Sequence, residues 1–210
     1  MPKVVFISDT HNFHAKIKIP SCDILVHSGD ATGRGTLQEV SSFLYWFSQQ
    51  PAKHKVFVAG NHDHLAERDS SMLKMLLSER PSITYLENSS AEVMGLKFWG
   101  SPWTLKYGNW AFMGDEELLK SKFEMMPEKV DIIVCHGPPH GILDLTSDGI
   151  HAGSKSLRHQ VIDRARPKVV CFGHIHEGYG TYKFGDTLYI NASICNGMYS
   201  PINLPITLEI

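Results

Sequence analysis

The segment VVFISDTH at residues 4–11 decides the fold, because an unbroken apolar run leads directly into Asp9 and His11. Continuous β-branched runs are typical of strands that are buried on both faces of a parallel sheet. The same arrangement recurs four times, as ILVHSGD at 24–30, VFVAGNHD at 56–63, IIVCHG at 132–137 and VVCFGHIH at 169–176. The sequence therefore predicts five buried strands that each end in Asp, Asn or His.

Helices and hairpins are predicted between these strands. Thr36 and Glu39 have the spacing of a capping box before an apolar face, which predicts a helix after Thr36. Residues 116–123 and 156–165 also have helical character, and the second helix should end before Pro167. Residues 91–99 and 181–190 alternate around turns that contain glycine, as antiparallel hairpins do. These segments predict an α/β fold with added antiparallel strands. Because the chain contains no repeats or linkers, we expect residues 1–210 to form a single domain.

The donors at the five strand ends are typical of a metal centre. In open α/β sheets, ligands bind outside the carboxyl ends of the strands. Nitrogen and oxygen donors without thiolate suit Mn, Fe or Zn better than Ca or a structural zinc site. Seven donors exceed the needs of one tetrahedral ion and suit two ions about 3.5–4 Å apart that share a carboxylate. The candidates are Asp9, His11, Asp30, Asn61, His136, His174 and His176.

Each of these motifs has an ordinary alternative explanation. A single histidine beside a strand is more often a hydrogen-bonded structural residue than a ligand, and Asn61-His62-Asp63 alone could form an ordinary turn. The occurrence of all five motifs at strand ends favours the metal site. The glycines before Asp30, Asn61 and His174 are expected to let the backbone turn sharply there.

Composition excludes several classes of protein. The chain has 210 residues, of which 42% are hydrophobic and 20% charged, so neither disorder nor a coiled coil is expected. A net charge of -2 argues against a general nucleic-acid binder. No apolar run is long enough to span a membrane, and no secretory leader or CxxC motif is evident. We therefore expect a reduced, cytoplasmic protein in which Cys135 and Cys171 are core residues.

The ordered motifs resemble the calcineurin-like metallophosphoesterase superfamily. The similarity spans residues 9–176, and the segments FGHIHEGYG at 172–180 and YINAS at 189–193 further resemble the metallophosphoesterase-domain-containing branch. Some members of that branch have glycine at the position of His174, whereas this chain keeps the full donor set. The resemblance therefore favours an active enzyme.

This resemblance implies a fold and a ligand set. The fold is a four-layer α/β/β/α sandwich with two mixed β-sheets. Asp30 would bridge two divalent ions, which are expected to be Mn, with Fe or Zn as alternatives. The other ligands would be Asp9, His11 and His176 on one ion, and Asn61, His136 and His174 on the second.

The resemblance also implies a mechanism. The ions would lower the pKa of a water, and the resulting metal-bound hydroxide would attack phosphorus in line. His62 would protonate the leaving oxygen, although it could instead be a turn residue. Gly33 stands where protein phosphatases have the Asp that orients this histidine, which argues against a Ser/Thr protein phosphatase. Arg34 could contact phosphate or be a solvent-exposed loop residue.

The substrate class stays open between several alternatives. The resemblance favours phosphodiesters, including cyclic nucleotides, with a small-molecule phosphomonoesterase as the alternative. A nuclease has no support from the charge, and a non-catalytic interaction scaffold should have lost ligands. Pocket walls could come from residues 101–115, with Trp103, Tyr107 and Trp110, or from 138–154, with His140, Asp148 and His151. These side chains could equally pack the loops onto the domain.

Overall fold

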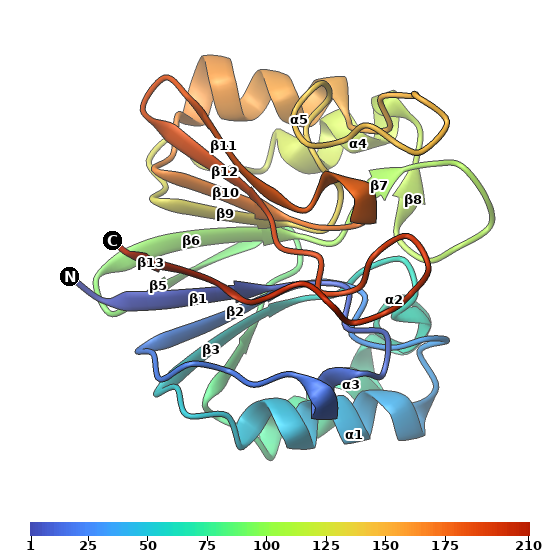
Figure 1. Cartoon of the computed structure of the whole chain (residues 1–210), viewed down its shortest axis with the longest axis vertical. Coiled ribbons are helices and arrows are strands. Elements are labelled where there is room, and N and C mark those ends of the chain that lie inside the picture. Colours follow the sequence, from blue (N-terminus) through green and yellow to red (C-terminus); the bar gives the residue numbers. More distant parts are fainter.

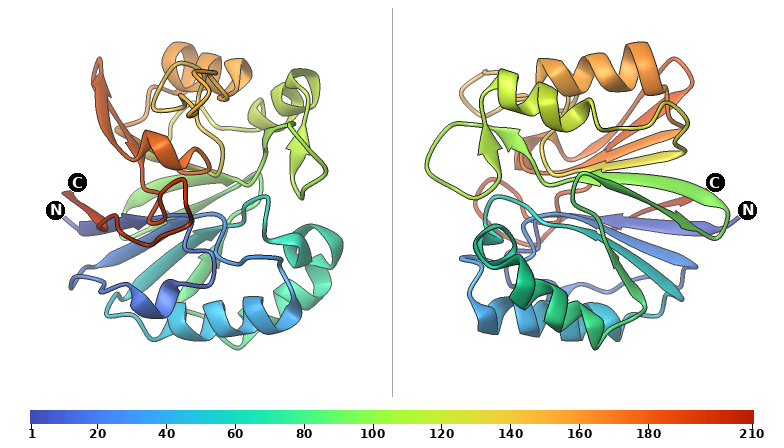
Figure 2. Two further views of the ribbon diagram at one scale, coloured as in Figure 1. Left: turned by 45° about the vertical axis from the view of Figure 1, so that its right-hand side comes forward. Right: turned by 180° about the vertical axis from the view of Figure 1, so that it is seen from behind.

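Two β-sheets lie face to face at the centre of the molecule, and helices cover the outer face of each (Figures 1 and 2). The computed structural model describes residues 1–210. Strands that run parallel and antiparallel occur in both sheets. The four-layer α/β/β/α sandwich with two mixed sheets is therefore confirmed.

The first sheet has the strand order β13-β1-β2-β3-β4. Strands β1 to β4 run parallel, and β13 pairs antiparallel with β1. The bounds are β1 (Lys3–Ile7), β2 (Ile24–Ser28), β3 (His54–Val58), β4 (Ile83–Tyr85) and β13 (Ile206–Glu209). The three predicted strands of this sheet are confirmed, and β4 and β13 are additions.

The second sheet has the order β11-β12-β10-β9-β6-β5, with four parallel inner strands and an antiparallel strand at each edge. Its bounds are β5 (Ser89–Val93), β6 (Leu96–Ser101), β9 (Ile132–Cys135), β10 (Val169–Phe172), β11 (Gly180–Phe184) and β12 (Thr187–Asn191). Both predicted hairpins are confirmed. A separate ribbon pairs β7 (Thr104–Leu105) with β8 (Met113–Gly114).

Helices cover the two outer faces of the sandwich. The first sheet is covered by α1 (Leu37–Ser48), α2 (His64–Arg68) and α3 (Ser70–Ser78), and the second by α4 (Glu116–Phe123) and α5 (Lys155–His159). Short turns of helix are η1 (His14–Lys16) and η3 (His176–Gly178). The capping box of α1 is confirmed, because Thr36 and Glu39 each accept a hydrogen bond from the other's backbone N–H.

The helix predicted at 156–165 differs from the observed one in its second half. After α5 the chain continues as η2 (Gln160–Ala165), a π-helical turn in which Arg166 N–H donates to the carbonyl of Val161. Arg166 is left-handed, with φ of 46°. Pro167 disfavours the right-handed helical conformation at the residue before it, so the helix ends by this route.

Three apolar clusters explain why the strands read as continuous apolar runs. In β1, Val4 and Phe6 pack between the sheets, whereas Val5 and Ile7 pack against the helices that cover the first sheet. In β9, Ile132 faces the other sheet and Cys135 faces the helices above. Because successive side chains point to opposite faces, both faces of such a strand must be apolar. The core positions predicted for Cys135 and Cys171 are confirmed.

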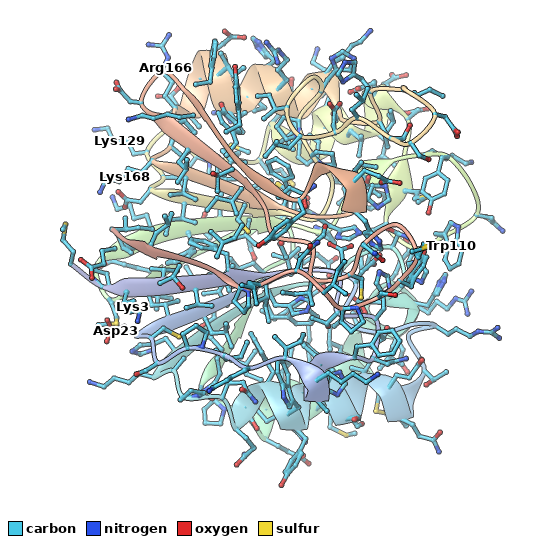
Figure 3. All side chains as sticks on the ribbon, in the orientation of Figure 1. Lys3, Asp23, Trp110, Lys129, Arg166 and Lys168 are labelled. Carbon is cyan, nitrogen blue, oxygen red and sulfur yellow. The ribbon has the colours of Figure 1, made fainter.

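The parallel strands direct their carboxyl ends to one edge of the sandwich. Trp110 lies among the loops at that edge, whereas Lys3 and Asp23, at the start of β1 and just before β2, lie at the opposite edge with both termini (Figure 3). The loops that follow β1, β2, β3, β9 and β10 are thus gathered together. No helix in the fold combines the length and the apolar character needed to cross a bilayer.

Candidate metal centre

The loops after the strands bring all seven predicted donors into one cluster. His176 Nε2 lies 3.4 Å from Asp9 Oδ1 and 3.3 Å from His11 Nε2. His136 Nε2 lies 3.4 Å from Asp30 Oδ2 and 2.8 Å from Asn61 Oδ1. Three sets of donor atoms lie within 4.8 Å of one another: Asp9, His11 and His176; His11, Asp30 and His62; and Asp30, His136 and His174. Asp30 therefore belongs to two of the three sets.

Four of these donors have a left-handed backbone. Asp9, His11, Asp30 and His174 have φ values between 40° and 67°. Residues other than glycine adopt this region rarely, and they do so mostly at functional sites where surrounding contacts hold them. Here Asp9 N–H donates to the Gly29 carbonyl at 2.9 Å, and His11 N–H donates to the Asp30 carbonyl at 3.1 Å. The ends of β1 and β2 therefore hold each other in this conformation.

Three donors are preceded by glycine mainly because a side chain would have no room at that position. A Cβ at Gly173 would lie 1.9 Å from Asp9 Oδ2, and a Cβ at Gly60 would lie 2.3 Å from Asp30 Oδ1. Only Gly29 also has a positive φ, of 107°. The expected sharp turn thus applies to Gly29, whereas Gly60 and Gly173 are needed so that a carboxylate can approach the backbone.

Backbone carbonyls set the orientation of three imidazoles. The Nδ1 atoms of His62, His136 and His176 lie 2.8, 3.0 and 2.9 Å from the carbonyl oxygens of Gly33, Ser28 and Asn196. A carbonyl only accepts, so each Nδ1 must carry the hydrogen. Each Nε2 is then left to face the carboxylates at the centre. This is the arrangement in which outer hydrogen bonds orient histidine ligands.

The two carboxylates are buried and ionised. Burial alone would raise the pKa of Asp9 and Asp30, but His176 beside Asp9 and His136 beside Asp30 hold both pKa values well below their usual range. Asp9 Oδ2 also accepts from Ser193 Oγ at 2.9 Å, and Asp30 Oδ1 accepts from His62 N–H at 2.7 Å. The centre therefore offers two carboxylates to a cation once the neighbouring imidazoles have lost their protons.

The donor set fits divalent cations. His11 Nδ1 is buried without a hydrogen-bond partner. Burial and the charge of His136 lower the pKa of His174 to about 3, so this imidazole is neutral and has a free lone pair. Carboxylates, neutral imidazoles and an amide oxygen are ligands that Mn, Fe and Zn accept. Such ions would bind to acceptor atoms whose lone pairs are not all used by hydrogen bonds within the protein.

His62 lies beside the cluster and faces the open cleft. Its ring stacks on Trp110 at 4.3 Å between centroids, and its Nε2 lies 3.9 Å from Asp30 Oδ2. Asp63 does not orient it, because the Asp63 carboxylate instead accepts from the backbone N–H groups of Ala31, Thr32 and Gly60. The Gly33 carbonyl takes the place that the missing carboxylate would have filled.

A cleft of about 280 Å³ opens over the donors. Tyr107, Glu177 and Tyr199 line it together with five of the candidate residues and Gly197. The Arg34 side chain is exposed and is not part of this lining. Of the predicted pocket aromatics, Tyr107 and Trp110 lie at the site, whereas Trp103 packs against the apolar core.

Sequence reasoning missed the contribution of the C-terminal segment. Ser193 Oγ donates a hydrogen bond to Asp9, and the Asn196 carbonyl accepts one from His176 Nδ1. The Tyr199 ring lies 4.8 Å from the His11 ring. Ser193 stands in the YINAS segment, so the resemblance contained a signal for it. Asn196 and Tyr199 occupy a loop whose sequence carries no recognisable pattern.

A calcineurin-like phosphoesterase model matches residues 2–178. The chain belongs to this family. The family is dinuclear and metal-dependent, so the chain is a metal-dependent phosphoesterase. Metallophosphoesterase domain-containing protein 1 of Homo sapiens is 34% identical over 230 residues, which cover 99% of this chain and 71% of that protein. The phosphoesterase thus lies in the metallophosphoesterase-domain-containing branch.

Other relatives agree with this assignment. The UPF0046 protein C25E10.12 of Caenorhabditis elegans is 35% identical, and the match covers 98% of this chain and 81% of that protein. The crystal structure of TT1561 of Thermus thermophilus matches 90% of this chain and 88% of its own, with a TM-score of 0.65 and 14% identity. At such low identity the structural likeness concerns the fold alone.

Substituting Gly173→Ala should abolish metal binding by this phosphoesterase. The added Cβ collides with the Asp9 carboxylate and with Ser8 Oγ, and the two strand ends cannot separate without displacing donors. Metal content after dialysis against Mn²⁺ should fall from two ions per chain towards none. Gly95→Ala is the control for destabilisation as such, because its φ of 78° also disfavours alanine although its Cβ would meet nothing within 4 Å. Full metal content in Gly173→Ala would contradict the packing argument.

Metal uptake should release protons. Burial would lower the pKa of His136 and His176, but the neighbouring carboxylates raise both to about 9. Both imidazoles are therefore protonated near neutral pH in the metal-free protein and must lose a proton to bind. Affinity should rise with pH up to about 9. Calorimetric Mn²⁺ titrations in buffers of different ionisation enthalpy should show roughly two protons released.

On binding Mn²⁺, His176→Asn should release about one proton fewer than the unmodified chain, since only His136 would then lose a proton. The exposed His159→Ala serves as control and should leave the number unchanged. Metal binding that shows no buffer dependence would mean that these histidines are not ligands.

Proposed function

We propose that this protein is a dinuclear-metal-dependent phosphodiesterase, with cyclic nucleotides among its candidate substrates. The observation that carries the proposal is the position of Asp30, whose Oδ2 lies 3.8 Å from His11 Nε2 and 3.4 Å from His136 Nε2 beneath an open cleft. A shared carboxylate is typical of two-metal hydrolytic sites. A non-catalytic scaffold would have no reason to keep every donor in place.

Seven residues are proposed as ligands. One ion would be held by Asp9, His11, Asp30 and His176, and the other by Asp30, Asn61, His136 and His174. The ions are proposed to be Mn, with Fe or Zn as alternatives, because all three accept this mixture of nitrogen and oxygen donors. When bound, two such ions supply a nucleophile at neutral pH and neutralise charge on the phosphate oxygens.

His62 is proposed as the proton donor to the leaving oxygen. Its Nδ1–H is engaged by the Gly33 carbonyl, so Nε2 is the atom that can carry and deliver a proton at the cleft. Trp110 covers one face of the ring and limits its movement. Arg34 is a weaker candidate for phosphate binding, because its exposed side chain would have to swing into the cleft from outside.

The charge of the cleft favours a diester over a monoester. A monoester carries one more negative charge at neutral pH, and enzymes commonly meet such charge with Arg or Lys. The lining contains neither residue, and Glu177 adds a carboxylate to it. A diester, with a single negative charge and two ester groups, fits this lining better. The small-molecule phosphomonoesterase is the alternative.

The compartment proposed for this protein is the cytoplasm. All four cysteines are free, and Cys135, Cys171 and Cys195 are buried without forming disulfides. Free cysteines are usual where glutathione and thioredoxin keep thiols reduced.

Metal-stripped protein given Mn²⁺ should hydrolyse bis-p-nitrophenyl phosphate faster than p-nitrophenyl phosphate. The same assay with 2′,3′- and 3′,5′-cyclic nucleotides then tests that substrate class. Asp30→Ala should lose bound metal and activity together, because the shared ligand is gone. The exposed Asp163→Ala is the control and should retain both. A preference for the monoester would move the assignment to a phosphatase.

His62→Ala should keep its metals and lose kcat by roughly 10²–10⁴-fold, the range expected for general acid catalysis. The loss should shrink as the leaving group becomes more acidic, since a stable phenolate needs no proton. Rates for a series of substituted phenyl esters measure this dependence. An equal loss across the series, or loss of metal in this variant, would instead place His62 in a binding or ligand role.

A further inference from the structure

A second cavity of about 410 Å³ adjoins the metal cleft. It shares Tyr107 and His174 with the cleft, so the two spaces are neighbours at those side chains. Its walls carry the aliphatic side chains of Leu105, Ile150 and Ala152, together with buried Ile175. Nothing in the proposed hydrolysis of the phosphate itself uses this space.

A buried carboxylate holds one wall of this cavity in place. Asp144 Oδ2 accepts from the backbone N–H groups of Gly141 and Gly153, each at 2.9 Å, and Asp144 Oδ1 lies 2.7 Å from His151 Nδ1. Backbone hydrogen bonds between His140 and Ser154, and between Ser154 and Pro138, close the base of the loop. The loop at 138–154 is therefore preformed, with His151 turned towards the cavity.

Exposed apolar side chains stand on both sides of the cavity. Ile150 is 62% exposed on the 138–154 loop, and Tyr107 is 64% exposed on the loop after β7. Neither contributes to an apolar cluster of the core. Exposed apolar groups that flank a concave site commonly mark ligand binding, and ligand pockets of this size are mostly apolar with a few polar groups.

We propose that this cavity binds an aromatic ester group of the substrate while the phosphate lies at the metal centre. The inference rests on the phosphodiesterase function proposed above. The Tyr107 and His151 rings offer surfaces on which a flat ring can stack, and the aliphatic walls exclude water from it. An aryl group and a nucleobase share this chemistry.

The position of the cavity indicates which ester group it holds. The cavity shares His174 with the metal cleft but not His62, which lines the cleft and stacks on Trp110. His62 is the proposed donor to the leaving oxygen, so the leaving group belongs on its side. The group in the cavity is therefore the ester that stays on phosphorus after hydrolysis.

Three diesters with one leaving group test this assignment. Methyl, phenyl and thymidine-5′ p-nitrophenyl phosphate all release p-nitrophenolate, so they differ only in the retained group. With Mn²⁺-loaded protein, kcat/KM should be at least roughly 10-fold higher for the two aromatic esters than for the methyl ester. A further gain for the thymidine ester would identify a nucleoside site, and equal gains would identify any aromatic ring.

Two variants and one control localise the effect. Leu105→Ala combined with Ile150→Ala removes wall contacts, and Ala152→Phe fills the space instead. Each should lower kcat/KM for the aromatic esters by about 10-fold and leave the methyl ester unchanged. Leu145→Ala is the matched control, because Leu145 is a half-exposed residue of the same loop that does not line this cavity.

The outcomes separate this inference from the phosphodiesterase proposal. Hydrolysis of all three esters at equal kcat/KM, unchanged in Ala152→Phe, would overturn the cavity assignment and keep the phosphodiesterase. Absence of metal-dependent hydrolysis of every ester would overturn the phosphodiesterase. In that case the methyl NMR shifts of Leu105 and Ile150 test the cavity assignment independently of hydrolysis. Phenyl phosphate should change these shifts and methyl phosphate should not. No change with either compound would refute the cavity assignment.

Discussion

Two buried carboxylates, Asp9 and Asp30, determine how the rest of this protein must be arranged. An ionised carboxylate in a protein interior is very costly unless cationic or hydrogen-bonding groups compensate it. Here the compensation comes from His136 and His176, from Ser193 and from backbone N–H groups. These groups follow different strands of both sheets, so the charges can be buried only when the two sheets are packed against each other. The same negative charge that makes the site costly also makes it a site for cations.

The recurring strand-end motifs predicted most of the fold and most of the site. Continuous apolar runs indicated five strands, and the family resemblance indicated the four-layer sandwich. The polar residues after the runs indicated seven candidate donors, which the structure brings into one cluster. The π-helical turn at Gln160–Ala165 and strand β13 escaped prediction. Pro167 indicated where the helix ends but not that its last turn is π-helical, and β13 is defined by its pairing with β1 at the far end of the sequence. Asn196 and Tyr199 were missed for a related reason, since their roles depend on a loop that returns to β1 across the whole sequence.

Specificity in this fold is separated from the metal chemistry. The donors come from strand ends that are pinned by glycines and by backbone hydrogen bonds, and they tolerate little change. The cleft and the adjoining cavity are instead lined by two loops, one after β7 and one anchored by Asp144. Loops on a rigid scaffold can vary without loss of the fold. Residues such as Tyr107, Ile150 and Ala152 can thus alter which ester is accepted while the donors stay in place.

The antiparallel pairing of β13 with β1 has a consequence for synthesis of the chain. The end of β1 leads into Asp9 and His11, yet its outer neighbour is the last strand of the fold to be made on the ribosome. Ser193, which donates to Asp9, and Asn196, which accepts from His176, also follow all the donors in the sequence. A nascent chain that has not reached residue 191 therefore has an open sheet edge and two incompletely supported donors. A chain truncated before residue 191 would contain all seven proposed donors and would still lack these partners of Asp9 and His176.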